Sequence, residues 1–154
     1  MKLKHTRLII RQLDKRMQAL QPLRDMEQPK DGWISLIRKT LNMSLRQLGE
    51  RLSLTPQGVK KIEKNEAEGG ITLNALREAG DALDLKLVYG FIPKNGSLEK
   101  MIERQATEMA RKIVLRTSTT MKLEDQENSG QRIKEAIAEL TEELKREMPK
   151  GLWD

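Results

Sequence analysis

Apolar residues recur at steps of three and four along most of the chain, which is the spacing of one face of an α-helix. The first series falls between His5 and Leu20, at Ile10, Leu13, Met17 and Leu20. The next stretch, residues 21–32, contains two prolines and a glycine and predicts a connector. We therefore expect a helical arm and a linker over residues 1–31.

Four short helices are predicted within residues 32–93. The first begins near Trp33, and the second begins after Ser44, where the sequence Ser-Leu-Arg-Gln matches a capping box. Thr55 provides an N-cap hydroxyl before a proline at the first helical position, where the missing N–H of proline is tolerated. Thr72 caps the fourth helix.

The rest of the chain predicts two longer helices. Leu85–Pro93 is rich in Val, Tyr, Phe and Ile and predicts an extended segment or short strand that can pair with its copy in a dimer. Ser97 and Ser129 each begin an amphipathic helix, and the polar residues 116–130 between them are expected to be irregular. The predicted fold is all-α, with an N-terminal helical arm, a helix-turn-helix domain over 32–93, C-terminal helices over 94–154 and at most one short strand.

Composition agrees with helices and limits the chemistry. Aromatic residues are 3% of the chain, so the core must be built from Leu, Ile, Met and Ala. The chain has no cysteine and a single histidine, His5, so it has almost no residues that could form thiolate or imidazole metal sites or histidine-based triads. Catalysis by carboxylates alone stays open. No apolar run approaches the roughly 20 residues that cross a bilayer. We expect a cytoplasmic protein with no metal and no cofactor.

Charge is unevenly distributed. The formal net charge is +6 and the sequence pI is about 9.6. Residues 1–64 contain 15 Lys and Arg against 6 acidic residues, and the remainder contains 14 against 17. A basic first half favours an acidic partner, and nucleic acid is the commonest one for a small basic protein.

The strongest motif lies in the middle of the chain. A short helix, a three-residue turn and a second helix are predicted, with buried positions at Leu45, Leu48, Leu52, Leu54, Val59 and Ile62. The second helix exposes Gln57, Lys60, Lys61 and Lys64, which share one stripe and include no acid. Lys can meet phosphates or guanine, and Gln can bond adenine. The alternative is an ordinary solvated lysine face.

The segment LRQLGERLSLTPQGVKKIEKNE resembles the helix-turn-helix of the phage-repressor and Cro-like regulators, and the resemblance covers about Trp33 to Leu85. It implies base contacts from Gln57 and Lys61, contacts near the backbone or groove edge from Thr55, Lys60 and Lys64, and a phosphate contact from Ser44. Arg46 and Gly58 are further candidate DNA contacts. A glycine inside a helix, as at Gly58, is expected where the backbone closely approaches the groove wall or another helix. The resemblance also implies a structural ion pair between Arg38 and Glu63. The chain departs from the family pattern at Ser53, where glycine is usual and the turn must be tolerated, and at Leu45, where glutamine is frequent.

Over nearly its full length, the chain also resembles the small bacterial family called mobile mystery protein A. The segments that carry this resemblance are DGWISLIRKTLNMSLRQLG, LKLVYGFIPKNGSLEKMIERQA, RTSTTMKLEDQ and the terminal LWD. Members of that family are similar to antitoxins and are encoded beside a protein with a Fic domain, the fold of AMP-transferring enzymes. The resemblance therefore implies a Fic-domain toxin as partner.

Antitoxins of Fic proteins often present a Ser/Thr-x-x-x-Glu-Gly/Asn helix whose glutamate blocks productive ATP binding. The stretch from Thr120 to Glu124 fits the first five positions, but Asp125 replaces Gly or Asn. Thr120 and Glu124 are therefore candidate toxin contacts. The alternative for this short pattern is a plain surface loop.

Two functions from different classes follow. The leading one is a homodimeric transcriptional regulator on a palindromic operator in double-stranded DNA, with the dimer formed through the N-terminal helix, the Leu85–Pro93 segment or the C-terminal helices. The other is an antitoxin that acts mainly by inhibiting a Fic-domain AMP-transferase. An enzyme has least support, because no nucleophile with a base or phosphate-binding glycine loop is found. RNA binding lacks stacking aromatics.

Overall fold

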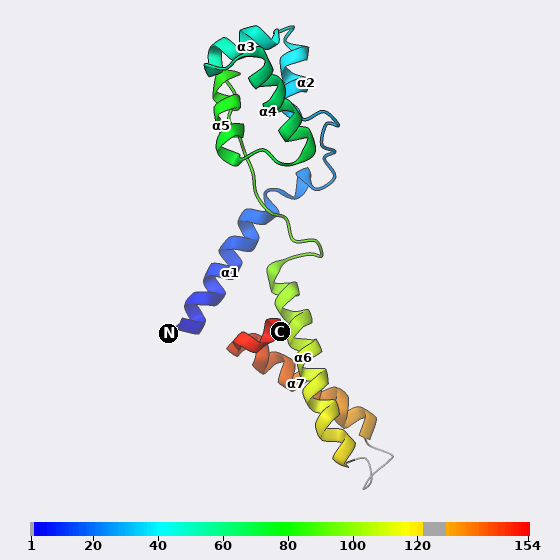
Figure 1. Cartoon of the computed structure of the whole chain (residues 1–154). Helices are drawn as coiled ribbons and strands as arrows, with labels where there is room; N and C mark the ends of the chain where they lie inside the picture. The colour runs from blue at the N-terminus through cyan, green and yellow to red at the C-terminus, as the bar shows by residue number, and fades with distance from the viewer. Residues whose placement is uncertain (1, 122–128) are drawn as a thin grey trace. The chain divides into compact units, whose positions relative to one another are not determined.

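The computed structural model describes residues 2–121 and 129–154, and within these it describes side chains for 4–117 and 130–154. The described residues form α-helices and short 3₁₀ helices and no strand, which confirms the all-α prediction (Figure 1). The α-helices are α1 (Lys2–Gln18), α2 (Trp33–Thr40), α3 (Leu45–Leu52), α4 (Pro56–Glu68), α5 (Leu73–Ala82), α6 (Leu98–Met121) and α7 (Ser129–Glu147), and the 3₁₀ helices are η1 (Gln21–Leu23) and η2 (Lys150–Trp153). None of the described helices has the length and apolar character needed to cross a membrane.

The chain divides into two compact units. The central unit is Pro22–Gly90, and the terminal unit combines Met1–Gln21 with Phe91–Asp154. This grouping differs from the expected division into residues 1–31, 32–93 and 94–154, because α1 packs against α6 instead of forming a separate arm.

The central unit buries one side of each of its four helices in a shared core. The core residues are Ile34, Leu48, Val59, Ala79 and Leu83, all less than 9% exposed. Each of α2, α3, α4 and α5 contributes to it because its apolar residues recur at helical spacing. In Figure 1, α4 runs between its neighbours α2 and α5.

Three of these helices begin with a side-chain cap from the residue before them. The Ser44 hydroxyl accepts a hydrogen bond from Gln47 N at 3.1 Å, and the Gln47 side chain accepts one from Ser44 N at 2.8 Å, which completes a capping box. Thr55 caps α4 through Gly58 N at 3.0 Å, and Thr72 caps α5 through Ala75 N at 3.1 Å. The starts predicted for these helices are confirmed.

Helix α2 is capped from elsewhere in the chain. Its N-cap residue, Gly32, has no side chain to contribute and adopts a φ of 84°. The carboxylate of Glu66 on α4 accepts the hydrogen bond from Ile34 N at 2.8 Å instead. A Cβ atom on Gly32 would lie 2.7 Å from that carboxylate oxygen, so only glycine fits here.

The terminal unit is centred on α6 and α7. Figure 1 shows α7 returning along α6, and the two helices make the most extensive contact between elements of the chain. Ala106 and Ala110 are fully buried on α6, so their small side chains allow close packing. Ile102, Leu144 and Leu152 complete the core, and Leu152 brings the C-terminal η2 onto α6.

Helix α1 joins this unit through an apolar contact and a cap. Ile10 packs against the α6–α7 core. The two carboxylate oxygens of Asp14 accept hydrogen bonds from Leu98 N at 2.8 Å and Glu99 N at 3.3 Å, which satisfies amides at the start of α6. The Ser97 hydroxyl accepts a further hydrogen bond from Lys100 N at 3.1 Å, so α6 begins with a local cap, as predicted, and with a second cap from an acid 84 residues earlier on α1.

The Leu85–Pro93 segment was expected to be extended or a short strand, and the described residues contain no strand there. Two other predictions of local structure are wrong. Leu54, expected to be buried, is 41% exposed. The residues from Arg116 to Met121 are not irregular but belong to α6. There the Thr117 hydroxyl bonds the carbonyl of Ile113 at 3.0 Å, so its side chain is compatible with the helix.

Candidate nucleic-acid interface

Helices α3 and α4 are joined by a tight turn of fixed geometry. Ser53 ends α3 in the left-handed conformation, with φ 56° and ψ 40°. Leu54 N then donates to the carbonyl of Gly49 at 2.8 Å. A Cβ atom on Gly49 would lie only 2.5 Å from Leu54 O, so the turn requires glycine at this point of α3. Serine is thus tolerated at the position where glycine was expected, at a cost in backbone strain.

A buried ion pair holds α4 against α2. Arg38 and Glu63 each have side chains only 10% exposed and are joined through Nε and one carboxylate oxygen. A second bond links Arg38 Nη2 to the other oxygen at 3.2 Å, and Nη1 donates to Met43 O at 2.9 Å. This is the pair that the family resemblance implies. Because both charges are partnered, α4 is held in one orientation relative to α2.

The opposite side of α4 carries the predicted stripe. Gln57, Lys60, Lys61 and Lys64 are all exposed, whereas Val59 and Glu63 are buried on the inner side. Lys64 has a single distant ion-pair contact, 3.9 Å to Glu68, and both side chains are more than 60% exposed. Lys60 and Lys61 have no ion-pair partner among the residues that the structure describes. We call these four residues the α4 stripe.

The turn before α4 lies near Gly58, three residues after the cap residue Thr55. A Cβ atom on Gly58 would lie 3.4 Å from both Leu54 Cβ and Thr55 Oγ1, which is an ordinary contact distance. Packing within the unit therefore does not require glycine at this position. Thr55 is exposed beside the first amides of α4, where the positive end of the helix dipole lies.

Ser44 and Arg46 lie at the start of α3 and are both exposed. The Ser44 hydroxyl is used by the capping box, so a phosphate there would have to share it. Arg46 pairs with Glu50, but both side chains are 66% exposed. Such surface pairs contribute little stability, so Arg46 can exchange Glu50 for another anion at small cost.

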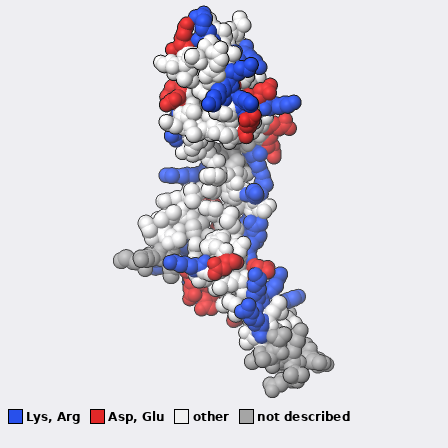
Figure 2. Space-filling model, in the orientation of Figure 1, with Lys and Arg blue, Asp and Glu red and all other residues white. Residues whose placement is uncertain are grey.

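Charge on the central unit is balanced overall. It contains 11 Lys and Arg and 10 Asp and Glu, a net charge of only +1. Figure 2 shows side chains of both signs over this part of the molecule. The α4 stripe is thus distinguished by its position, and the first acid on the same side of the helix is Glu68, one turn beyond Lys64.

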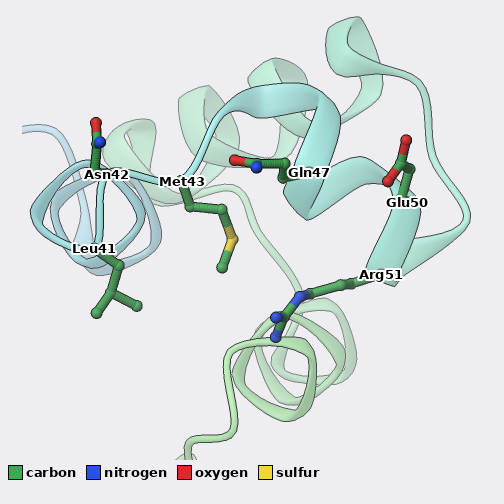
Figure 3. A pocket seen from close by; sticks show the side chains of 6 residues that line it. All are labelled: Leu41, Asn42, Met43, Gln47, Glu50 and Arg51. Atoms are coloured by element: carbon green, nitrogen blue, oxygen red, sulfur yellow. The ribbon is translucent and has the colours of Figure 1, made fainter.

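A hollow on the flank of α3 is a second candidate binding surface beside the α4 stripe. It is lined by Leu41, Asn42, Met43, Gln47, Glu50 and Arg51 (Figure 3). Arg51 points toward α5, where its Nη1 donates to the carbonyl of Ala82 at 3.0 Å. Gln47 serves the capping box, and Glu50 pairs with Arg46. Three of the four polar side chains of the hollow, those of Gln47, Glu50 and Arg51, are therefore already used by the fold.

The candidate toxin contacts cannot be placed. The side chain of Thr120 and the whole of Glu124 lie outside the described residues. Over the part of the chain that the structure describes, no group of three or more His, Cys, Asp or Glu residues is placed to hold a metal ion.

Two contacts that organise the chain were not predicted from the sequence. These are the caps that Glu66 gives to α2 and Asp14 gives to α6. The only available signals were a helix start without its own cap at Gly32, and an isolated acid in a basic helix at Asp14.

Searches among protein-family models, curated proteins and solved structures find no match for this chain. The function proposed below therefore depends on the residues and geometry of the chain itself.

Proposed function

We propose that this protein is a sequence-specific regulator of transcription that binds double-stranded DNA, with α4 in the major groove. The observation that carries the proposal is the α4 stripe: an amide and three lysines exposed on one side of a helix whose other side is held by a buried core and a buried ion pair. A helix presented in this way can enter a groove without rearrangement of the unit.

The side chains of the stripe suit the edges of base pairs. Gln57 can form two hydrogen bonds with adenine, through N6 and N7. Lys61 can donate to guanine O6 and N7, and Lys60 and Lys64 can meet phosphates at the groove edge. The stripe therefore combines base recognition with charge neutralisation, the two parts of specific binding.

The symmetry of a homodimer predicts the form of the DNA site. A homodimer would place two copies of α4 in successive major grooves, about 34 Å apart, on a palindromic site. Among the exposed apolar residues, Val88, Tyr89 and Phe91 are at least 59% exposed and are available for contact with a second copy. The promoter of the protein's own gene is the expected site, so that the protein limits its own synthesis in the cytoplasm as antitoxin-like regulators do.

The test is binding to the DNA upstream of the protein's own coding sequence, measured beside a scrambled duplex of equal length. The parent should prefer the upstream DNA, and Gln57→Ala or Lys61→Ala should reduce that preference by about 10- to 100-fold, because each removes a base contact. Affinity should fall steeply with added salt.

Matched controls come from the terminal unit. Gln131→Ala and Lys134→Ala remove the same groups from exposed positions on α7 and should leave the preference unchanged. Equal affinity for both duplexes, or a preference unaffected by either change on α4, would contradict the proposal.

A further inference from the structure

The net positive charge of the protein is concentrated in its first helix. Residues 1–21 contain six Lys and Arg and one acid, a net charge of +5 out of the +6 of the chain. Residues 91–154 contain 12 of each sign, and the central unit has a net charge of +1. The α4 stripe therefore belongs to a nearly neutral unit, and most of the net positive charge of the chain lies on α1.

Four cations of α1 lie on one side of the helix. Lys4, Arg7, Arg11 and Lys15 follow one another at steps of three, four and four residues, so they share one stripe. All four are exposed, and none has an ion-pair partner among the described residues. We call them the α1 stripe.

The single acid of α1 does not neutralise this stripe. Both oxygens of Asp14 accept hydrogen bonds from backbone amides at the start of α6, at 2.8 and 3.3 Å. Ile10 packs into the core of the terminal unit. The cap and this apolar contact fix α1 on that unit, so the α1 stripe is presented by an ordered helix and remains uncompensated.

We propose that the α1 stripe binds the phosphate backbone of double-stranded DNA, as a second contact surface that does not read sequence. From Lys4 to Lys15 the helix rises about 16 Å, and a duplex presents one negative charge per about 1.7 Å of its axis. Four aligned cations thus meet enough phosphates for each to have a partner. Taking a duplex as the ligand depends on the function proposed above.

Flexible cationic side chains without fixed neighbours suit phosphates better than base edges. No Asn is present on α1, Gln12 does not lie on the stripe, and Gln18, three residues after Lys15, lies on it only at the last residue of the helix. An anionic membrane has the same charge, but the chain carries a second cationic stripe with a base-reading residue, Gln57, which favours DNA.

The test uses a mixed-sequence duplex of about three helical turns without an inverted repeat. The variant changes Lys4, Arg7, Arg11 and Lys15 to Gln, a residue that keeps helix propensity. The slope of log K against log salt should be smaller in magnitude for the variant than for the parent by about 3 to 4. Between 50 and 200 mM salt, the parent should therefore lose about 100-fold more affinity than the variant.

The control variant changes Arg132, Lys134, Arg146 and Lys150 to Gln, which removes the same charge from exposed positions of the terminal unit. Its slope should change by less than about 1. Equal slopes for the two variants would overturn the proposal, because net charge alone would then account for binding. Far-ultraviolet circular dichroism checks that both variants remain helical.

A second arm measures binding to vesicles of phosphatidylserine and phosphatidylcholine. Loss of vesicle binding in the α1 variant with an unchanged slope on DNA would also overturn the proposal, in favour of a membrane surface. The preference for upstream over scrambled DNA separates the two proposals. The α1 variant should still prefer upstream DNA. Gln57→Ala should lose this preference and keep the parent's slope of log K against log salt.

Discussion

The central unit is made of helices of 8 to 13 residues, whereas the terminal unit is centred on α6 and α7, of 24 and 19 residues. Helices as short as those of the central unit are marginal alone and depend on caps and tertiary contacts. Correspondingly, the central unit has three side-chain caps, a cap from Glu66 and the Arg38–Glu63 pair. In the terminal unit, Ser97 and Asp14 also cap α6, but the long helices pack mainly through small and aliphatic residues.

We therefore expect the two units to lose stability for different reasons. Polar groups determine the geometry of the central unit, so loss of one partner should be costly there. In the terminal unit, apolar packing between long helices is the main contact, so loss of a buried apolar side chain should be costly there. Each unit contains one tryptophan, Trp33 in α2 and Trp153 in η2. Replacing either with Phe leaves a fluorescence reporter for the other unit, so that urea unfolding can be followed separately.

The largest effect is expected from Glu63→Ala. The substitution leaves the buried Arg38 without its partner and should destabilise the central unit by about 3 to 5 kcal/mol. The measurement is the urea midpoint reported by Trp33. Glu50→Ala breaks the exposed pair with Arg46 and should cost at most about 0.5 kcal/mol. Similar urea midpoints for the two variants would show that the buried ion pair stabilises the central unit no more than the exposed one.

A smaller effect is expected in the terminal unit from Leu152→Ala. Leu152 is 2% exposed, and its truncation should cost roughly 2 to 3 kcal/mol because a cavity opens against α6. The midpoint reported by Trp153 should fall while that of Trp33 stays the same. Lys150→Ala is the control on the same 3₁₀ helix, where the side chain is exposed. A change below about 0.5 kcal/mol in Leu152→Ala would show that this contact does not stabilise the unit.

The smallest effect has the opposite sign. Ser53→Gly should stabilise the central unit by about 1 kcal/mol, because glycine adopts the left-handed conformation without the strain that serine bears. Ser53→Ala keeps the Cβ atom and should give no such gain. If both variants unfold at the midpoint of the parent, the turn between α3 and α4 is not strained.

Local signals predicted most of the central unit. Ser44, Thr55 and Thr72 mark their helices because a cap bonds an amide three residues away, so both partners lie in one short stretch. The α4 stripe was predicted in the same way, since helical spacing alone places its residues together. Its exposure is observed, but its use in binding DNA remains a prediction.

The failures of prediction arise where partners are distant in sequence. Glu66 caps a helix 32 residues earlier, and Asp14 caps one 84 residues later, so no window along the chain contains both partners. The Leu85–Pro93 segment, for which an extended conformation and a short strand were both expected alternatives, illustrates the converse. Its residues have high β-propensity, but propensity becomes structure only when a neighbouring strand accepts the hydrogen bonds.

The cap on α2 has a consequence for the order in which the central unit folds. Helix α4 begins and ends with its own caps, Thr55 and Gly69, whereas the first turn of α2 depends on Glu66, which lies on α4. We therefore expect α4 to form before α2 during refolding, and α2 to open first under mild denaturant. Amide hydrogen exchange would show this as weaker protection at Ile34 than at Val59, and the reverse ranking would contradict it.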